Sequence, residues 1–356
     1  MKYTRYLLFL FFTVVGFFST TVYAQEGEDD KVDVKGILFG HVEDSYGWHI
    51  TTIGDKEITI SLPVILYSKE KGWTLFSSKQ LEKNDGIYQG YYIAKEGTYA
   101  GKIVEKNSLG EEVRPIDLSI TKVTMALFIN SALLLLIILG VANWYRKNDP
   151  TKKAPKGFVG FMEMFIMMIN DEVIKPCVGE NHQKFAPYLL TAFFFIFLNN
   201  MMGLIPIFPG GVTVTGNITI TMFLALATFF VTNFFGSKDY WKEVFWPDVP
   251  TWLKAPIPIM PVIELFGLFT KPIALMIRLF ANLLAGHMVM LILTCLVFIT
   301  ASFGPAINVP MSITSILFNM FMTVLEILVA FIQAYVFTML SAVFIGLAQP
   351  HKKAVE

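Results

Sequence analysis

Long apolar segments, separated by short polar ones, make up most of the chain from residue 122 to residue 348. A membrane-spanning helix needs about 20 mainly apolar residues, and five segments meet this requirement. They cover residues 123–144, 188–208, 217–235, 261–299 and 311–348. Residues 157–176 instead mix apolar with acidic and polar positions, which predicts an amphipathic helix on the membrane surface. The pattern therefore predicts an all-α polytopic membrane protein with five crossings.

The last two apolar segments are almost twice as long as one crossing requires. A straight helix of this length would measure roughly 57 Å, whereas the hydrocarbon core of a bilayer is about 30 Å thick. Each helix must therefore tilt strongly or bend, and Pro272 is a candidate for a kink. With the uncharged loop at residues 302–310 between them, we expect a long, strongly tilted C-terminal helical hairpin.

Lysine and arginine residues predict the orientation, because they concentrate on the cytoplasmic side of membrane proteins. They cluster after the first span and after the third, at Arg146, Lys147, Lys152, Lys153, Lys156, Lys238 and Lys242. The loop at residues 209–216, after the second span, carries no charge, and HKK at residues 351–353 follows the last span. We expect a multi-pass membrane protein with its N-terminus outside and its C-terminus in the cytoplasm.

The first 120 residues have a different pattern. Residues 1–24 combine a positive start, a 12-residue apolar core and a VYA cleavage site, which predicts a secretory signal peptide. An uncleaved anchor helix is the alternative, although the core is short for a span. Residues 25–120 contain short β-branched and aromatic runs between Gly, Asp and Lys clusters, as strands and turns do. We expect a small β-rich extramembrane segment there, followed by a membrane domain over residues 121–356.

Composition supports a membrane protein and excludes several other classes. Hydrophobic residues make up 54% of the chain and charged residues only 16%, whereas soluble domains are about a quarter charged. The net charge is zero, so the chain has no basic footprint for nucleic acid. Cys177 and Cys295 lie far apart, and no spacing typical of metal ligands occurs. Nothing in the sequence indicates a cofactor or a catalytic centre.

Charged residues are rare in the predicted hairpin. Those between residues 255 and 348 are Glu264, Lys271, Arg278 and Glu326, and the same stretch contains His287. The first three are seven positions apart, so they share one face of a helix. His287 follows Arg278 by nine positions, which is about 180° around the helix, and therefore points the opposite way.

Polar amides accompany these groups on both helices. Asn282 follows Arg278 by four positions and lies near its face, while Asn319, Glu326 and Gln333 form a stripe on the last helix. His287 and Glu326 are suited to passing protons, because histidine titrates near neutral pH and burial can raise a glutamate toward the same range. A helix-packing role for His287 is the simpler alternative, but so many polar residues on two adjacent helices favour a proton relay.

Of these residues, Arg278 is the most costly to place inside a membrane. An arginine at the centre of a bilayer costs about 2.5–3.5 kcal/mol on insertion scales and about 10–17 kcal/mol in simulations of isolated helices. Three explanations are open. The side chain could reach the headgroups from a tilted helix, pair permanently with Glu326, or meet a transient counter-charge on another protein.

The motif MIRLFANLLAGH, residues 276–287, resembles the signature of the F-type ATP synthase subunit a family. The resemblance extends over roughly residues 120–350. Its other motifs are DEVIKP, FLNNMMGLIP, TGNITITMFLAL, ELFGLFTKPIALMIRLFANLLAGH and EILVAFIQAYVFTML. The segment at residues 25–120 lies outside the common core of the family, so the resemblance implies no function for it.

The resemblance implies a role for each of the matching residues. Arg278 matches the arginine that meets the carboxylates of the rotating c-ring, Asn282 the polar residue after it, and Gln333 the glutamine beside it. His287 and Glu326 match the acid–histidine pair of the outer half-channel, with the two partners exchanged relative to other members. Glu264 matches an acidic position of the inner half-channel.

The implied protein is a non-catalytic subunit of the bacterial inner membrane, with a periplasmic N-terminus and a cytoplasmic C-terminus. It would conduct protons beside the c-ring, contact peripheral-stalk b subunits and lipid, and bind no nucleic acid. The competing hypothesis is an ion-coupled secondary transporter with an internal Arg278–Glu326 pair. Transporters of that kind usually contain internal repeats, and the sequence shows none. A membrane-bound enzyme would need clusters of ligand residues. The sequence leaves open whether the transported ion is H⁺ or Na⁺, and His287 favours H⁺.

Overall fold

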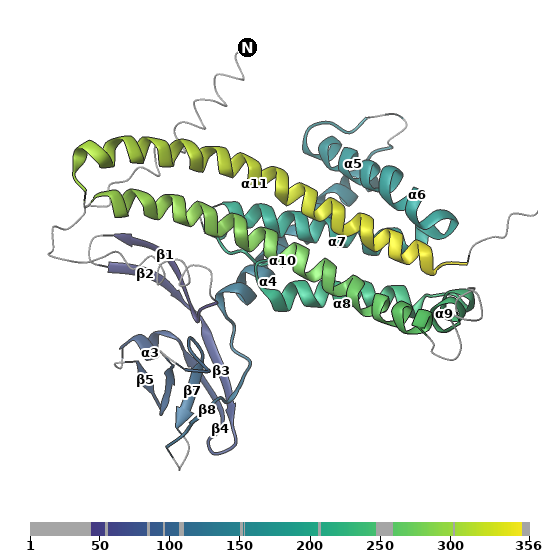
Figure 1. Cartoon of the computed structure of the whole chain (residues 1–356). Helices are drawn as coiled ribbons and strands as arrows, with labels where there is room; N and C mark the ends of the chain where they lie inside the picture. Colours follow the sequence, from purple (N-terminus) through teal and green to yellow (C-terminus); the bar gives the residue numbers. More distant parts are fainter. Residues whose placement is uncertain are drawn as a thin grey trace, which may run out of the picture.

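The computed structural model describes residues 44–350 except 54–55, 84–85, 95–96, 107–109, 150–151, 153, 206–207, 247–258 and 302. The predicted signal peptide, residues 1–24, lies outside this range. Figure 1 shows a bundle of long helices with a group of short strands near the end where α10 and α11 are joined.

Helices dominate the described part of the chain from residue 122 onward. They are α4 (Lys122–Lys147), α5 (Phe158–Met168), the π-helix η1 (Ile169–Ile174), α6 (Lys175–Val178), the 3₁₀-helix η2 (Gly179–Asn181), α7 (His182–Leu204), α8 (Ile218–Phe234), α9 (Lys238–Phe245), α10 (Ile259–Ala301) and α11 (Pro305–Ala348). The predicted helical class is therefore confirmed for this part of the chain.

Several of these helices are long and apolar enough to cross a membrane. Within the described residues there are four: Lys122–Lys147, Phe158–Leu204, Met260–Ala301 and Pro305–Ala348. The count becomes five if α8 and α9, which are bent by 105° at their junction, form one broken span. The five predicted crossings correspond to the upper count.

The C-terminal hairpin consists of two continuous helices of 43 and 44 residues. Helix α10 runs through Pro272 without a break. Helix α11 begins at Pro305, within the predicted loop, because proline has no N–H to leave unsatisfied in a first helical turn. The two helices lie side by side over their length (Figure 1).

The predicted surface helix at residues 157–176 becomes α5, η1 and the start of α6. Asp171, Glu172 and Lys175 are exposed, whereas Glu163 and Asn170 are half-buried. Asp171 pairs with Lys175 at 2.6 Å. Its apolar side is covered by protein, since Ile169, Val173 and Ile174 are buried in the core that α7 and α11 complete. In α5, however, Phe158, Phe161, Met164 and Met167 are 48–57% exposed, so the apolar residues of the segment do not all lie on one covered face.

Nine strands form three antiparallel sheets in the described residues before α4. They are β1 (Gly47–Ile53), β2 (Lys56–Ser61), β3 (Pro63–Ser68), β4 (Gly72–Ser77), β5 (Ile87–Tyr88), β6 (Tyr91–Ile93), β7 (Ile103–Lys106), β8 (Glu112–Val113) and β9 (Ile116–Asp117), with a short helix α3 (Lys79–Lys83). The sheet orders are β1-β2, β4-β3-β9 and β5-β6-β7-β8. A shared core joins the last two sheets: Val64, Leu66 and Phe76 pack with Tyr91 and Ile103.

The β region is attached to the first membrane helix by specific contacts. The Asp44 carboxylate accepts a hydrogen bond from the Val123 N–H at 3.1 Å and thereby satisfies a free donor at the start of α4. Trp48 is buried against Val123 and lies 5.0 Å from the ring of Phe208. The strands therefore sit directly on the end of α4.

Candidate functional site

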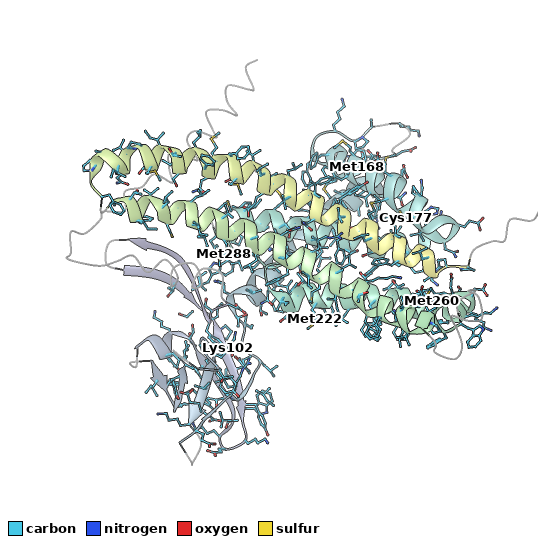
Figure 2. All side chains as sticks on the ribbon, in the orientation of Figure 1. Lys102, Met168, Cys177, Met222, Met260 and Met288 are labelled. Atoms are coloured by element: carbon cyan, nitrogen blue, oxygen red, sulfur yellow. The ribbon has the colours of Figure 1, made fainter. Side chains whose placement is uncertain are left out.

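Helices α10 and α11 bring together two of the residues singled out by the sequence. The Nδ1 atom of His287 lies 3.6 Å from the Glu326 carboxylate, and the two side chains are 16% and 5% exposed. Figure 2 labels Met288, the neighbour of His287, where α10 runs beside α11. The pair is buried inside the hairpin, although its two members are 39 positions apart in the chain.

Gly286 makes room for this pair. A methyl group at residue 286 would lie 3.2 Å from the Cγ and Cδ atoms of Glu326 and would collide with its Oε1 oxygen. Only a residue without a side chain allows the carboxylate to lie against the backbone of α10. This role was not predicted from the sequence, where the one signal is a glycine next to His287 in an otherwise helical segment.

His287, Glu326 and Asn319, which lies more than one turn from Glu326 along α11, have buried polar atoms that no hydrogen bond within the described residues satisfies. They are Nδ1 of His287, both carboxylate oxygens of Glu326 and Oδ1 of Asn319. Leaving such groups without a partner is costly, so buried polar groups of this kind normally bind ordered water.

A line of polar contacts continues from this pair toward the turn between α10 and α11. Asn319 donates to Thr294 at 3.0 Å, and Ser315 donates to the carbonyl of Leu293. Nearer the turn, Thr300 donates to Asn308 at 3.0 Å. We call the polar side chains along this line the hairpin seam. They are Thr294, Thr300, Asn308, Ser312, Ser315, Asn319 and Thr323. Except for Asn319, its residues were not predicted, because isolated Ser and Thr in apolar helices have no distinctive spacing.

Arg278 lies on the other side of α10, as its nine-residue separation from His287 predicts. Arg278 and Asn282 are both exposed, and the neighbouring Ile277 is 51% exposed. Among the described residues, Arg278 forms no ion pair, and Glu326 lies beside His287 instead. The internal Arg278–Glu326 pair considered above is therefore not formed.

The remaining predicted residues lie apart from the pair. Gln333 is buried on α11, seven residues after Glu326. Glu264 is half-buried near the start of α10 and lies 23 residues before His287, which is about 34 Å along a helix. Along α10, Arg278 lies between Glu264 and His287. The structure thus separates Glu264 from the buried pair and leaves Arg278 in the intervening stretch.

A second polar region lies near Glu264, at the end of the hairpin away from the turn. A pocket between α8, α9, α10 and α11 is lined by Thr228, Thr232, Asn233, Tyr240 and Lys271 together with apolar residues. The hydroxyl of Thr232 is buried and has no hydrogen-bond partner among the described residues. Polar groups therefore reach into the bundle from this end as well.

Buried asparagines connect α7 to its neighbours. The Asn130 amide donates to Asn199 at 2.9 Å, and Thr215 donates to Asn200 at 2.6 Å. Asn200 also donates to the carbonyl of Ala330 on α11, at 3.4 Å. Asn199 and Asn200 belong to the motif FLNNMMGLIP, but neither was predicted to have an individual role.

Two family models match different parts of the chain. The family model described as "ATP synthase A chain" matches residues 125–346, a range that contains all six predicted site residues. A second family model, described as a domain of unknown function (DUF8433), matches residues 37–119 and thus covers most of the β region.

Individual relatives match about two thirds of the chain or more. "ATP synthase subunit a" of Chlorobium phaeobacteroides is 44% identical over 243 residues, which cover 67% of this chain and 67% of that protein. "ATP synthase subunit a 2" of Chlorobaculum tepidum is 43% identical over 67% of this chain and 66% of its own length. "ATP synthase subunit a" of Myxococcus xanthus is 40% identical over 73% of this chain and 83% of its own length. The chain belongs to the ATP synthase A chain family.

Proposed function

We propose that the chain is the proton-channel stator subunit of a rotary F-type ATP synthase, a membrane subunit without a catalytic centre of its own. The family and the apolar helices support a multi-pass membrane protein that works within this complex. The proposed proton-channel role rests on one observation, which is that the two sides of α10 differ. Arg278 is exposed on an apolar outer surface, while His287 faces Glu326 inside the hairpin.

Arg278 then supplies the charge that a c-ring carboxylate needs. A carboxylate held in lipid is neutral when protonated and costly when ionised, and an arginine across the interface offsets that cost. The exposure of Arg278 and the lack of an ion pair to it among the described residues both leave the guanidinium available to such a partner. Asn282, also exposed and one turn away, would lie in the same contact.

The two polar regions would serve as the two half-channels. Protons would enter from the periplasm along the hairpin seam to Glu326 and His287, cross to the c-ring carboxylate, and leave by the polar pocket near Glu264 on the cytoplasmic side. Gln333, buried on α11 seven residues after Glu326, would lie along this route. Arg278, between the two regions along α10, would prevent protons from passing directly from one to the other.

The position of the chain in the membrane follows from its charge distribution. The cluster of lysines and arginines after α4 and the HKK segment support a cytoplasmic C-terminus, with the β region in the periplasm. Besides the c-ring, the remaining exposed apolar helix surfaces would contact lipid and the b subunits of the peripheral stalk. The transporter alternative loses its support, because Glu326 lies beside His287 and not beside Arg278.

Arg278→Ala in inverted vesicles that contain the whole complex tests the proposal. We expect loss of ATP-driven proton pumping, measured by quenching of a pH-sensitive dye, with the subunit still assembled. Arg146→Ala is the matched control, because it removes an exposed arginine outside the hairpin. Normal pumping by the Arg278→Ala complex would contradict the central claim.

A further inference from the structure

The β region exposes a continuous apolar surface on one sheet. The outward face of the β4-β3-β9 sheet carries six large side chains: Ile65, Tyr67, Trp73, Leu75, Ile116 and Leu118. Leu75 is paired with Ile65 across β3 and β4, and Tyr67 is paired with Trp73 on one side and with Ile116 on the other. Residues paired in this way point to the same face of a sheet. The rings of Tyr67 and Trp73 lie 5.0 Å apart.

Four of these side chains are exposed in the isolated chain, and Ile65 and Tyr67 are half-buried. Leu75 is 72% exposed, Trp73 66%, Ile116 60% and Leu118 57%. The opposite face of the same sheet is covered, because Val64, Leu66 and Phe76 are buried in the core shared with the other sheet. An antiparallel sheet with one packed face normally turns polar residues outward. We call the six residues the apolar sheet face. Its composition indicates that something apolar covers it.

The covalent connection to α4 indicates what that cover is. Strand β9 ends at Asp117 and α4 begins at Lys122, so four residues join the apolar sheet face to the first membrane helix. Even fully extended, this link spans no more than about 18 Å. Helix α4 itself exposes apolar side chains along its length, including Phe128 at 61% and Leu136 at 69%. The apolar sheet face thus begins next to the point where the chain enters the membrane.

The orientation of the sheet agrees with this position. Figure 1 shows β3 and β4 on the side of the β region nearer to α8, with β5 and α3 on the far side. Tyrosine and tryptophan are the residues that proteins place at the boundary between lipid and water, where the ring is apolar and its polar atom stays hydrated. A surface of this composition, held this close to a membrane helix, suits the outer leaflet of the bilayer.

We propose that the apolar sheet face rests in the outer leaflet of the membrane, with Trp73 and Leu75 among the lipid headgroups and upper acyl chains. The β region is then a monotopic membrane-binding element, held by lipid on this face and by Trp48 and Asp44 at the end of α4. This contact belongs to the part of the chain that precedes the ATP synthase A chain match, and it is independent of proton transfer.

Site-specific fluorescence in the intact complex tests this contact. The native cysteines are first replaced by Cys177→Ser and Cys295→Ser, and the environment-sensitive dye NBD is attached at Leu75→Cys. Ile87→Cys is the matched control, because Ile87 is also apolar and is 57% exposed, but on β5 in the other sheet. The complexes are placed in phosphatidylcholine vesicles with or without lipids that carry a nitroxide just below the headgroup.

The proposal predicts a blue-shifted emission at residue 75 and loss of most of that emission with nitroxide lipids, while the dye at residue 87 reports water and is unaffected. Leu118→Cys is the second reporter, in case the first change disturbs the sheet, and should behave like residue 75. Emission typical of water at both reporters would overturn the proposal. A blue shift without quenching by nitroxide lipids would also overturn it, since a protein would then cover the face.

Discussion

Arg278 and His287 lie nine residues apart on one helix, yet their surroundings differ completely. Arg278 is exposed beside apolar side chains, whereas His287 is 16% exposed and faces a carboxylate that is 5% exposed. Helical periodicity predicted these opposite directions. It could not predict that His287 and Glu326 would meet, because the alignment of two helices along each other depends on packing and not on spacing within either one.

Gly286 provides a sharp test of the pair at the scale of one residue. In an ordinary helix, alanine is more favourable than glycine by about 1 kcal/mol, so Gly286→Ala should not weaken α10 itself. Because the added methyl group would collide with the Glu326 carboxylate, we expect Gly286→Ala to displace that group and to reduce ATP-driven proton pumping strongly. Pumping and subunit content are measured in the same inverted vesicles.

Gly267→Ala is the control for this prediction. Gly267 lies on the same helix, and a methyl group there would meet nothing within 4 Å. The control complex should pump as the unmodified complex does. Equal pumping by both variants would show that the close approach of α10 to Glu326 has no part in proton transfer.

At the scale of the element, membrane helices proved easier to predict than strands. The predicted start of the first span, residue 123, differs by one position from the start of α4, because the change from polar to apolar sequence marks the membrane boundary. The pairing of the strands could not be predicted from the sequence. Strand β9, for example, pairs with β3 from about 50 positions earlier, and only two residues of each strand are matched.

The hairpin seam carries a prediction at this scale. Thr294 accepts a hydrogen bond from Asn319 across the two helices, so Thr294→Val removes a polar atom from the seam while keeping the shape of the side chain. If protons enter along the seam, this change should slow proton flow driven by an imposed pH gradient. The flow is measured in vesicles from which the catalytic sector has been stripped.

Thr314→Val is the matched control for Thr294→Val. Both threonines are exposed and donate at 2.9 Å to the carbonyl four residues earlier in their own helices, but Thr314 has no hydrogen bond to α10 among the described residues. Proton flow should be unchanged in the control. A seam role would be excluded if Thr294→Val conducted protons as fast as Thr314→Val.

At the scale of the whole molecule, an apolar cluster around Trp48 joins the β region to the bundle. Trp48 is 4% exposed and packs against Val123 and the loop that contains Val212 and Val214. The sequence predicted a separate β-rich segment and a membrane domain, but no pattern in either one indicated the contact between them. Contacts of this kind depend on the three-dimensional positions of segments more than 150 residues apart.

Trp48→Ala should therefore loosen the β region from the bundle. Truncation of a buried aromatic side chain typically costs about 3–5 kcal/mol, which is a large loss of stability for a single contact between two regions. We expect faster proteolysis within the β region of the reconstituted complex, with unchanged helical content. Ile87→Ala, an exposed position away from α4, is the control and should leave the cleavage rate unchanged. Identical cleavage of both variants would show that Trp48 does not anchor the region.

The place of Arg278 along α10 has an electrical consequence. A membrane potential of 100 mV is worth about 2.3 kcal/mol per elementary charge, and in an unbroken bilayer it falls across about 30 Å of hydrocarbon. In the proposed stator, water-accessible groups extend inward from both ends of the hairpin. The voltage drop is then confined to the shorter stretch between them. The local field at the guanidinium of Arg278 therefore exceeds the average field across the membrane, and each ring carboxylate changes its charge where that field is strongest.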